Sequence, residues 1–192
     1  MGPLSAGGGA PARPGERLRL ATAWLGGCSG CHMSLLDLDE RLLELAPRLA
    51  LVYSPLVDVK AFPEGVAATL VEGAVCSDAH LELARRIRAC SRLVVALGDC
   101  AVTGNVSALR NPLGSALPVL DRAYRDLADL QPQHPGPPEL PRLLDRVLPL
   151  HEVIPVDLFL PGCPPGADLL HAVLLDLVAG RLPALQGQVR FG

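Results

Sequence analysis

The sequence "LRLATAWLGGCSGCHMSLLDLDE", residues 18–40, joins an apolar run to an amphipathic pattern through a glycine-rich loop that holds two cysteines. Its first part, Leu18–Leu25, has the length and composition of a buried β-strand. After the second cysteine, leucine recurs at steps of three and four as far as Leu45, which predicts a helix that ends before Pro47. A strand that leads through a short loop into a helix is the repeating unit of an α/β sheet.

The rest of the chain continues this alternation of strands and helices. The run Leu93–Leu97 is apolar throughout, as expected for a strand buried on both faces of a parallel sheet. We therefore expect an α/β fold, a flavodoxin-like doubly wound parallel sheet in a single domain, with strand order 2-1-3-4-5 by analogy. The other predicted strands are Leu49–Val57, Leu70–Val75 and Val153–Leu160. The predicted helices are Ala79–Cys90, which Asp78 could cap, Leu113–Leu130, Arg142–Val147 and Asp168–Ala179.

Two segments are rich in proline and glycine. Residues 1–16, "MGPLSAGGGAPARPGE", predict a disordered tail before a single domain at residues 17–192, and residues 131–141 predict an extended loop. The tail has neither the hydrophobic core of a signal peptide nor a twin-arginine pair. We therefore expect a cytoplasmic protein whose six cysteines are thiols or metal ligands rather than disulfides.

The composition limits the classes of function. Hydrophobic residues make up 49% of the 192, so the chain can bury a core without disulfide bonds. Aromatic residues make up only 3% and the formal net charge is −3, which argues against a nucleic-acid partner. No apolar run approaches the roughly 18 residues that span a bilayer, so no membrane span is expected.

Five of the six cysteines follow predicted strands, and only Cys90 falls within a predicted helix. Because the carboxyl ends of parallel strands meet at one edge of the sheet, these five cysteines are expected near that edge, where ligands bind in open α/β sheets. Glycines beside them would let the backbone approach a ligand closely. The five cysteines are Cys28, Cys31, Cys76, Cys100 and Cys163.

Several ligands are compatible with these cysteines. An iron–sulfur cluster fits best, because one CxxC pair with two distant single cysteines suits assembly from separate strand ends, and because a helix N-terminus near Cys31 would favour an anionic group. Zinc sites more often pair two short-spaced ligand sets. A redox CxxC would leave Cys100 and Cys163 unexplained. FMN is a less favoured ligand, because the loop that would cradle its phosphate is "GGCSGC".

Four motifs together resemble the small subunit of nickel–iron hydrogenases, and most closely the cytoplasmic, NAD-reducing type. They are "GGCSGCHMSLLDLDERLLEL", "VEGAV", "VVALGDCAVTGNVSALRN" and "LPGCPPGAD", and the similarity covers about Leu18–Pro183. The cluster subunit of complex I has two adjacent cysteines in its first motif, whereas Ser29 and Gly30 separate them here, which favours hydrogenase. The short chain without a leader resembles the minimal, one-cluster form.

The resemblance implies one [4Fe–4S] cluster ligated by Cys28, Cys31, Cys100 and Cys163, proximal to a Ni–Fe site held by a large subunit. This chain would supply no catalytic residue to H2 cleavage. It would pass electrons to diaphorase and iron–sulfur subunits that reduce NAD(P)+, in an obligate heteromer. The alternatives are the same subunit type in a deazaflavin-, ferredoxin- or sulfur-linked hydrogenase, or a zinc-stabilised interaction domain.

Other polar residues have less definite roles. Glu72, within the apolar "LVEGAV", is interpreted either as a proton relay near the subunit interface or as a carboxylate that accepts hydrogen bonds from cluster-loop amides. We expect Cys76 to be a buried structural thiol, and Asp99 to support the Cys100 turn by an Asx-type hydrogen bond. His32 and His151 are expected to be surface or hydrogen-bonded histidines without a catalytic role.

Overall fold

A computed structural model describes residues 17–136, 140–185 and 191. Five parallel strands form the central sheet in the order β2-β1-β3-β5-β7, which is the predicted order 2-1-3-4-5 when these strands are counted along the chain. The predicted tail and part of the predicted loop at 131–141 lie outside the described residues. The strands are β1 (Leu18–Trp24), β2 (Leu49–Tyr53), β3 (Val66–Glu72), β5 (Ser91–Leu97) and β7 (Leu158–Leu160).

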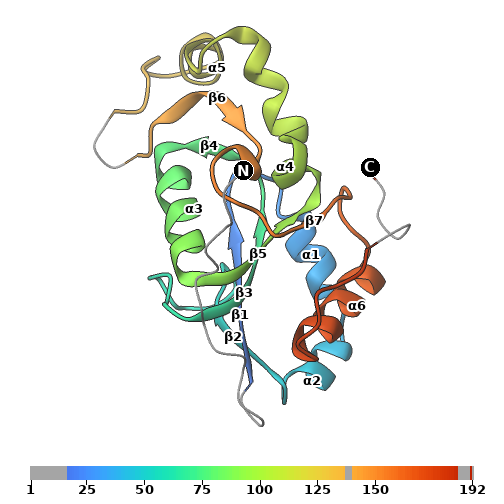
Figure 1. Cartoon of the computed structure of the whole chain (residues 1–192). Helices are drawn as coiled ribbons and strands as arrows, with labels where there is room; N and C mark the ends of the chain where they lie inside the picture. The colour runs from blue at the N-terminus through green and yellow to red at the C-terminus, as the bar shows by residue number, and fades with distance from the viewer. Residues whose placement is uncertain (1–16, 137–139, 186–190, 192) are drawn as a thin grey trace, which may run out of the picture.

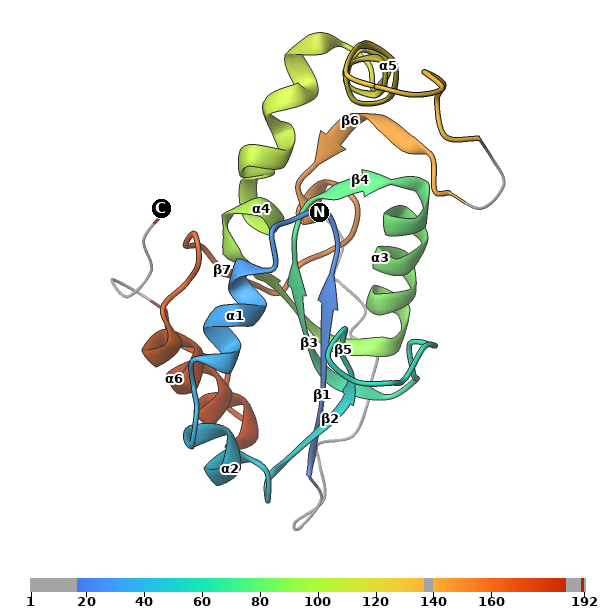
Figure 2. The same cartoon turned by 180° about the vertical axis from the view of Figure 1, so that it is seen from behind.

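Helices cover both faces of this sheet, as Figures 1 and 2 show. On one face lie α1 (Gly30–Leu36), α2 (Arg41–Leu45) and α6 (Ala167–Val178), and on the other lies α3 (Asp78–Cys90). Neighbouring strand residues therefore enter different cores: Leu70 packs with α1 and α6, whereas Val71 packs with α3. Both side chains are fully buried, which explains why the strands read as continuous apolar runs and confirms the doubly wound fold.

A second, two-stranded antiparallel sheet pairs β4 (Val75–Ser77) with β6 (Leu143–Leu148). The predicted helix at Arg142–Val147 was therefore wrong. Tertiary contacts outweigh the local pattern here: the Asn111 side chain bonds both the amide and the carbonyl of Val147, and Arg110 donates to the carbonyls of Leu144 and Asp145.

Several predicted boundaries also shift. The predicted helix after Cys31 is split into α1 and α2, because Asp39 adopts a left-handed backbone with φ +47°. The strand predicted at Val153–Leu160 is limited to β7, since Asp157 turns its carboxylate to the amide of Val94 in the neighbouring strand. The strand predicted at Leu70–Val75 is divided at Gly73 between β3 and β4.

The segment between β5 and β6 is more helical than predicted. It contains α4 (Gly98–Thr103), the 3₁₀ helix η1 (Asn105–Leu113), α5 (Leu117–Asp121) and the π-helix η2 (Arg122–Asp126). Of these elements, α5 and η2 fall within the helix predicted at Leu113–Leu130. One further 3₁₀ turn, η3 (Leu150–Glu152), precedes β7. In the described part of the chain, no helix has both the length and the apolar character needed to cross a membrane.

Candidate metal centre

The loops that follow the parallel strands converge at the end of the sheet toward which β1 points, at the top of Figure 1. The loop after β1 carries Cys28 and leads into α1 with Cys31, while α4 carries Cys100 directly after β5. Cys163 follows β7 in the loop before α6. The strand order β1-β3-β5-β7 therefore places these cysteines on neighbouring loops, as the sequence predicts.

Backbone hydrogen bonds join the loops after β1 and β3. The amide of Gly26 donates to the carbonyl of Ala74 at 2.8 Å, and the amide of Ala74 donates to the carbonyl of Gly26 at 2.9 Å. Gly73 has φ +90°, and a Cβ at this position would lie 2.9 Å from the backbone nitrogen of Gly26. Only glycine allows the two backbones to approach this closely.

Asp99 joins the loops after β5 and β7. Its amide donates to the carbonyl of Gly162 at 2.9 Å, and its Oδ1 accepts from the amide of Gly162 at 2.6 Å. The carboxylate is buried, so water does not compete for these hydrogen bonds. Asp99 thus supports the Cys100 turn by bonding across to the Cys163 loop, whereas the expectation from sequence was an Asx turn.

The four predicted ligand thiols lie within electrostatic reach of one another. The pKa of Cys31 is raised far above its usual value, first by burial, then by the Glu72 carboxylate, and then by the other three thiols, Cys100, Cys28 and Cys163. The pKa of Cys100 is raised by burial, by Cys28 and Cys163, and by Glu72, against a lowering hydrogen bond from Ser107. Nearby thiols disfavour one another's charge, and this effect adds to burial in raising the pKa values of Cys31 and Cys100.

The remaining two cysteines have other surroundings. Burial raises the pKa of Cys76 and the nearby Arg110 lowers it, and its thiol donates to the carbonyl of Ala74 at 3.4 Å. The side chain is half-buried rather than fully buried. Cys90 is the last residue of α3.

Two contacts fix individual sulfur atoms. Gly98 has φ +78°, and a Cβ there would lie 2.2 Å from Sγ of Cys31, so the thiol rests directly on this glycine. The side-chain amide of Asn105 donates to Sγ of Cys163 at 3.5 Å. The sequence interpretation did not single out Asn105 or Ser107, although both lie within eight residues of Cys100 and carry polar groups that can reach sulfur.

The donor set suits an iron–sulfur cluster. Four thiols from three loops are soft ligands, and cysteine thiolates are the usual ligands of [4Fe–4S] clusters. In the described part of the chain, no three His, Cys, Asp or Glu side chains converge where one metal ion could be held. A four-iron cluster takes one cysteine per iron at its corners, so its ligands do not need to converge on a single point.

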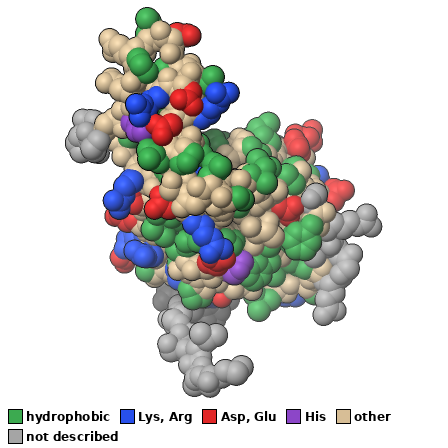
Figure 3. Space-filling model, turned by 90° about the horizontal axis from the view of Figure 1, so that it is seen from above, with side chains coloured by type: hydrophobic (Ala, Val, Ile, Leu, Met, Phe, Trp, Pro, Cys, Tyr) green, Lys and Arg blue, Asp and Glu red, His purple; other side chains and the backbone are tan. Residues whose placement is uncertain are grey.

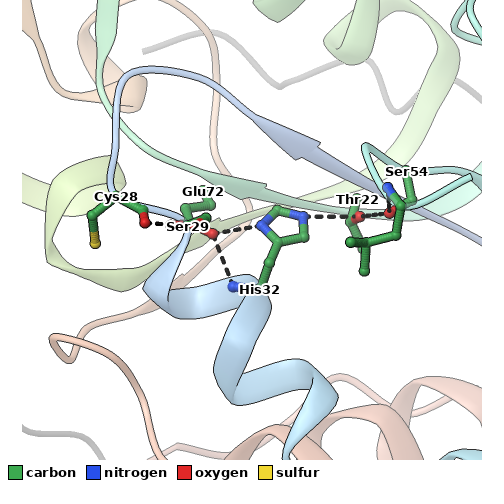
Figure 4. Close-up of polar contacts among 7 residues, drawn as sticks. Thr22, Cys28, Ser29, His32, Ser54 and Glu72 are labelled. Atoms are coloured by element: carbon green, nitrogen blue, oxygen red, sulfur yellow. Dashed lines mark hydrogen bonds and ion pairs between the residues drawn. The ribbon is translucent and has the colours of Figure 1, made fainter.

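A buried polar chain runs beneath the Cys28–Cys31 loop (Figure 4). Oε2 of Glu72 accepts a hydrogen bond from the His32 amide at 2.9 Å and contacts Nδ1 of the same residue. On the other side of the ring, Nε2 of His32 lies 3.0 Å from Oγ1 of Thr22, which donates to Ser54 at 2.8 Å.

The polar chain bears on three expectations from sequence. Glu72 does accept a hydrogen bond from a cluster-loop amide, while its role as a proton relay stays a prediction. His32 is buried and hydrogen-bonded, and His151 is exposed. The first turn of α1 was expected to offer its amides to an anionic ligand, but the amide of His32 is already used by Glu72.

Residues 28–177 match the family described as NADH ubiquinone oxidoreductase, 20 Kd subunit. The chain belongs to this family. It is 41% identical over 169 residues to the NAD-reducing hydrogenase HoxS subunit delta of Cupriavidus necator, a match that covers 86% of this chain and 80% of that protein. The predicted membership of the hydrogenase small subunits is therefore confirmed.

Two further family members give the range of the similarity. A solved NAD+-reducing [NiFe]-hydrogenase in the H2-reduced state contains a chain that superposes with a TM-score of 0.87 at 40% identity, over 92% of this chain and all of that one. The F420-non-reducing hydrogenase of Methanothermobacter marburgensis has a subunit that is 39% identical over 86% of this chain. This chain spans only 54% of the length of that relative.

Proposed function

We propose that this chain is the electron-transfer small subunit of a cytoplasmic [NiFe] hydrogenase. One [4Fe–4S] cluster, held by Cys28, Cys31, Cys100 and Cys163, would relay electrons between the Ni–Fe site of a large subunit and an NAD(P)-linked diaphorase module. The observation that carries the proposal is the placement of these four cysteines on the segments that follow β1, β5 and β7, with Sγ of Cys31 lying against Gly98, two residues before Cys100. The similarity to the NAD-reducing hydrogenase subunit supports the electron acceptor.

The depth of the four thiols suits this role. Cys31 is buried and Cys100 half-buried, so they would anchor the inner side of the cluster, while Cys28 and Cys163 are exposed at its outer side. The cluster, when bound, supplies one-electron transfer. The protein residues keep it in place: Gly98 admits Cys31, Asn105 bonds Cys163, and Asp99 holds two of the ligand loops together.

An exposed ligand edge needs a partner to exclude water and to receive electrons. Figure 3 shows hydrophobic side chains over the middle of the face viewed from above, with charged side chains on the projecting part and along the margins. Large apolar side chains are exposed on the elements next to the ligand loops, an arrangement typical of a protein interface. They are Trp24, Met33, Val106 and Leu109. We therefore assign this edge to the large subunit.

Anaerobic purification of the protein with its partner chains tests the proposal. We expect about four irons per chain and an absorbance shoulder near 400 nm, and no zinc. Cys100→Ala should abolish cluster assembly, whereas the matched variant Cys76→Ala should retain the iron. Zinc without iron, or a full cluster in Cys100→Ala, would contradict the ligand assignment.

A second candidate keeps the cluster and changes the electron acceptor. The F420-non-reducing hydrogenase relative is almost as similar to this chain as the NAD-reducing one, at 39% against 41% identity. The purified complex distinguishes the two candidates. Hydrogen-dependent reduction of NAD+ or NADP+ supports the first, whereas reduction of only other acceptors supports the second.

A further inference from the structure

The polar chain in Figure 4 links four buried polar side chains beneath the Cys28–Cys31 loop. Its side chains come from β1, β3, α1 and the residue after β2, and all are buried. Burying polar and ionisable groups costs free energy that apolar side chains of similar size would not cost. Such a network therefore points to a geometric requirement at the site it touches. Its members are Glu72, His32, Thr22 and Ser54.

The carboxylate end of the polar chain lies against both arms of the first ligand loop. Oε2 of Glu72 accepts from the amide of His32, the residue next to Cys31. A Cβ on Gly27, the residue before Cys28, would lie 3.6 Å from Oε1 of the same carboxylate. Glu72 thus bonds the residue after one ligand cysteine and lies close to the residue before the other.

The hydroxyl end fixes the imidazole ring. The hydroxyl of Thr22 donates to Ser54 at 2.8 Å, and Nε2 of His32 lies 3.0 Å from the same hydroxyl oxygen. Ser54 in turn accepts from the amide of Leu56 at 3.2 Å. The ring is therefore held at both nitrogens, and its orientation is set by strands β1 and β2, on the side of the ring away from Glu72.

We propose that Thr22, His32 and Ser54 are positioning residues that hold Glu72 against the Cys28–Cys31 loop and so set the geometry and reduction potential of the cluster. The inference rests on the proposed function, because it concerns the cluster that these cysteines would bind. Thr22 itself acts only through His32. Small displacements of a ligand loop change the hydrogen bonds and the electrostatic field at a cluster, which tune its potential.

The chain offers a matched control for this proposal. Thr69 in β3 is the registered neighbour of Ala21 in β1, and its hydroxyl is buried and bonded to Ser91 at 2.7 Å. Thr69 and Thr22 are therefore both fully buried, strand-borne and hydrogen-bonded to a serine, but only Thr22 contacts His32. Replacing either by valine removes one buried hydroxyl.

The experiment compares Thr22→Val, Thr22→Ser and Thr69→Val in the anaerobically purified complex. The readouts are the electron paramagnetic resonance spectrum of the reduced cluster and its midpoint potential in a redox titration. We expect Thr22→Val to displace the midpoint and broaden the spectrum, Thr22→Ser to restore both, and Thr69→Val to match the wild type. If Thr22→Val does not yield folded protein, Ser54→Ala takes its place and should shift the same two quantities.

The experiment distinguishes failure of the proposed function from failure of the positioning role. A wild-type complex without an iron–sulfur cluster would overturn the proposed function and this inference with it. A wild-type complex with its cluster, in which Thr22→Val or Ser54→Ala has the spectrum and midpoint of Thr69→Val, would overturn the positioning role alone.

Discussion

Replacing Gly98 by alanine should displace Cys31 and prevent cluster assembly. Gly98 has φ +78°, and a methyl group there would lie 2.2 Å from the sulfur of Cys31. Ordinary nonbonded contacts between heavy atoms are about 3.5–4 Å, so the overlap exceeds 1 Å. Cys31 is 7% exposed and packs in the core beside Leu35, so the sulfur cannot move outward without repacking its neighbours.

Two effects contribute to the expected loss of stability. A non-glycine residue at this φ costs about 1–2 kcal/mol of unfolding free energy, and overpacking a buried site typically costs a further 1–3 kcal/mol or so. The first effect would occur at any glycine with the same backbone. Gly114 provides that comparison, because it also has φ +78° and a Cβ there would meet no atom within 4 Å.

The assay therefore compares Gly98→Ala with Gly114→Ala. Urea unfolding of the apoprotein should show a loss of about 1–2 kcal/mol in Gly114→Ala and about 2–5 kcal/mol in Gly98→Ala. Iron content should stay at the wild-type level in the first variant and fall sharply in the second. Equal iron content in the two variants would refute the argument that Cys31 depends on this close approach.

Two further predictions concern the ligand loops. Asp99→Ala leaves the buried amide of Gly162 without a hydrogen bond to this carboxylate, so urea unfolding should show that the free energy of unfolding falls by about 1–3 kcal/mol. In the control Asp168→Ala, the lost carboxylate is exposed and pairs with Arg41 at the surface, so the free energy of unfolding should change by less than about 1 kcal/mol. Equal losses in the two variants would contradict the loop-joining role of Asp99. Burial, Glu72 and the neighbouring thiols raise the pKa of Cys31 above the usual 9.0, so the folded apoprotein keeps a proton that the unfolded chain releases. The contribution of the protonated Cys31 thiol to stability is complete below about pH 9 and decreases as the pH rises further. The free energy of unfolding, measured in urea between about pH 8 and 10.5, should therefore decrease less steeply with pH in Cys31→Ala than in the wild type. An unchanged slope would contradict this prediction.

The parallel sheet was predictable because its inner strands β1, β3 and β5 are largely buried, whereas the strand order was expected by analogy alone. Leu70 and Val71 enter opposite cores, so the sequence shows continuous apolar runs, and such runs indicate a covered parallel sheet. β6 was not predictable by the same reasoning. The apolar residues of β6 are spaced by one, three and four residues, which is a helical period. The segment is held extended by its pairing with β4 and by bonds from the distant Asn111 and Arg110.

The site was predictable only to the level of its loops. Cys28, Cys100 and Cys163 follow strands whose order could be inferred, so their convergence follows from topology. The polar chain beneath them depends on contacts between residues 32 and 40 positions apart, Thr22 with Ser54 and His32 with Glu72, for which local sequence gives no signal. Glu72 alone stood out, because a carboxylate inside an apolar strand needs a partner.

The ligand loops are joined to one another without any contribution from a metal. The Gly26–Ala74 bonds tie the loops after β1 and β3, and the Asp99–Gly162 bonds tie those after β5 and β7. Two hydrophobic cores, one on each face of the sheet, lie beneath them. Small metal-dependent domains lack such a core, and their metal-binding energy is folding energy. This chain has two such cores, so we expect the apoprotein to fold and to keep the cysteine-bearing loops together without iron. Under the proposed function, cluster binding would have to offset the burial that keeps Cys31 protonated and the repulsion between the thiolates that ligation creates, and the iron charge would supply that compensation.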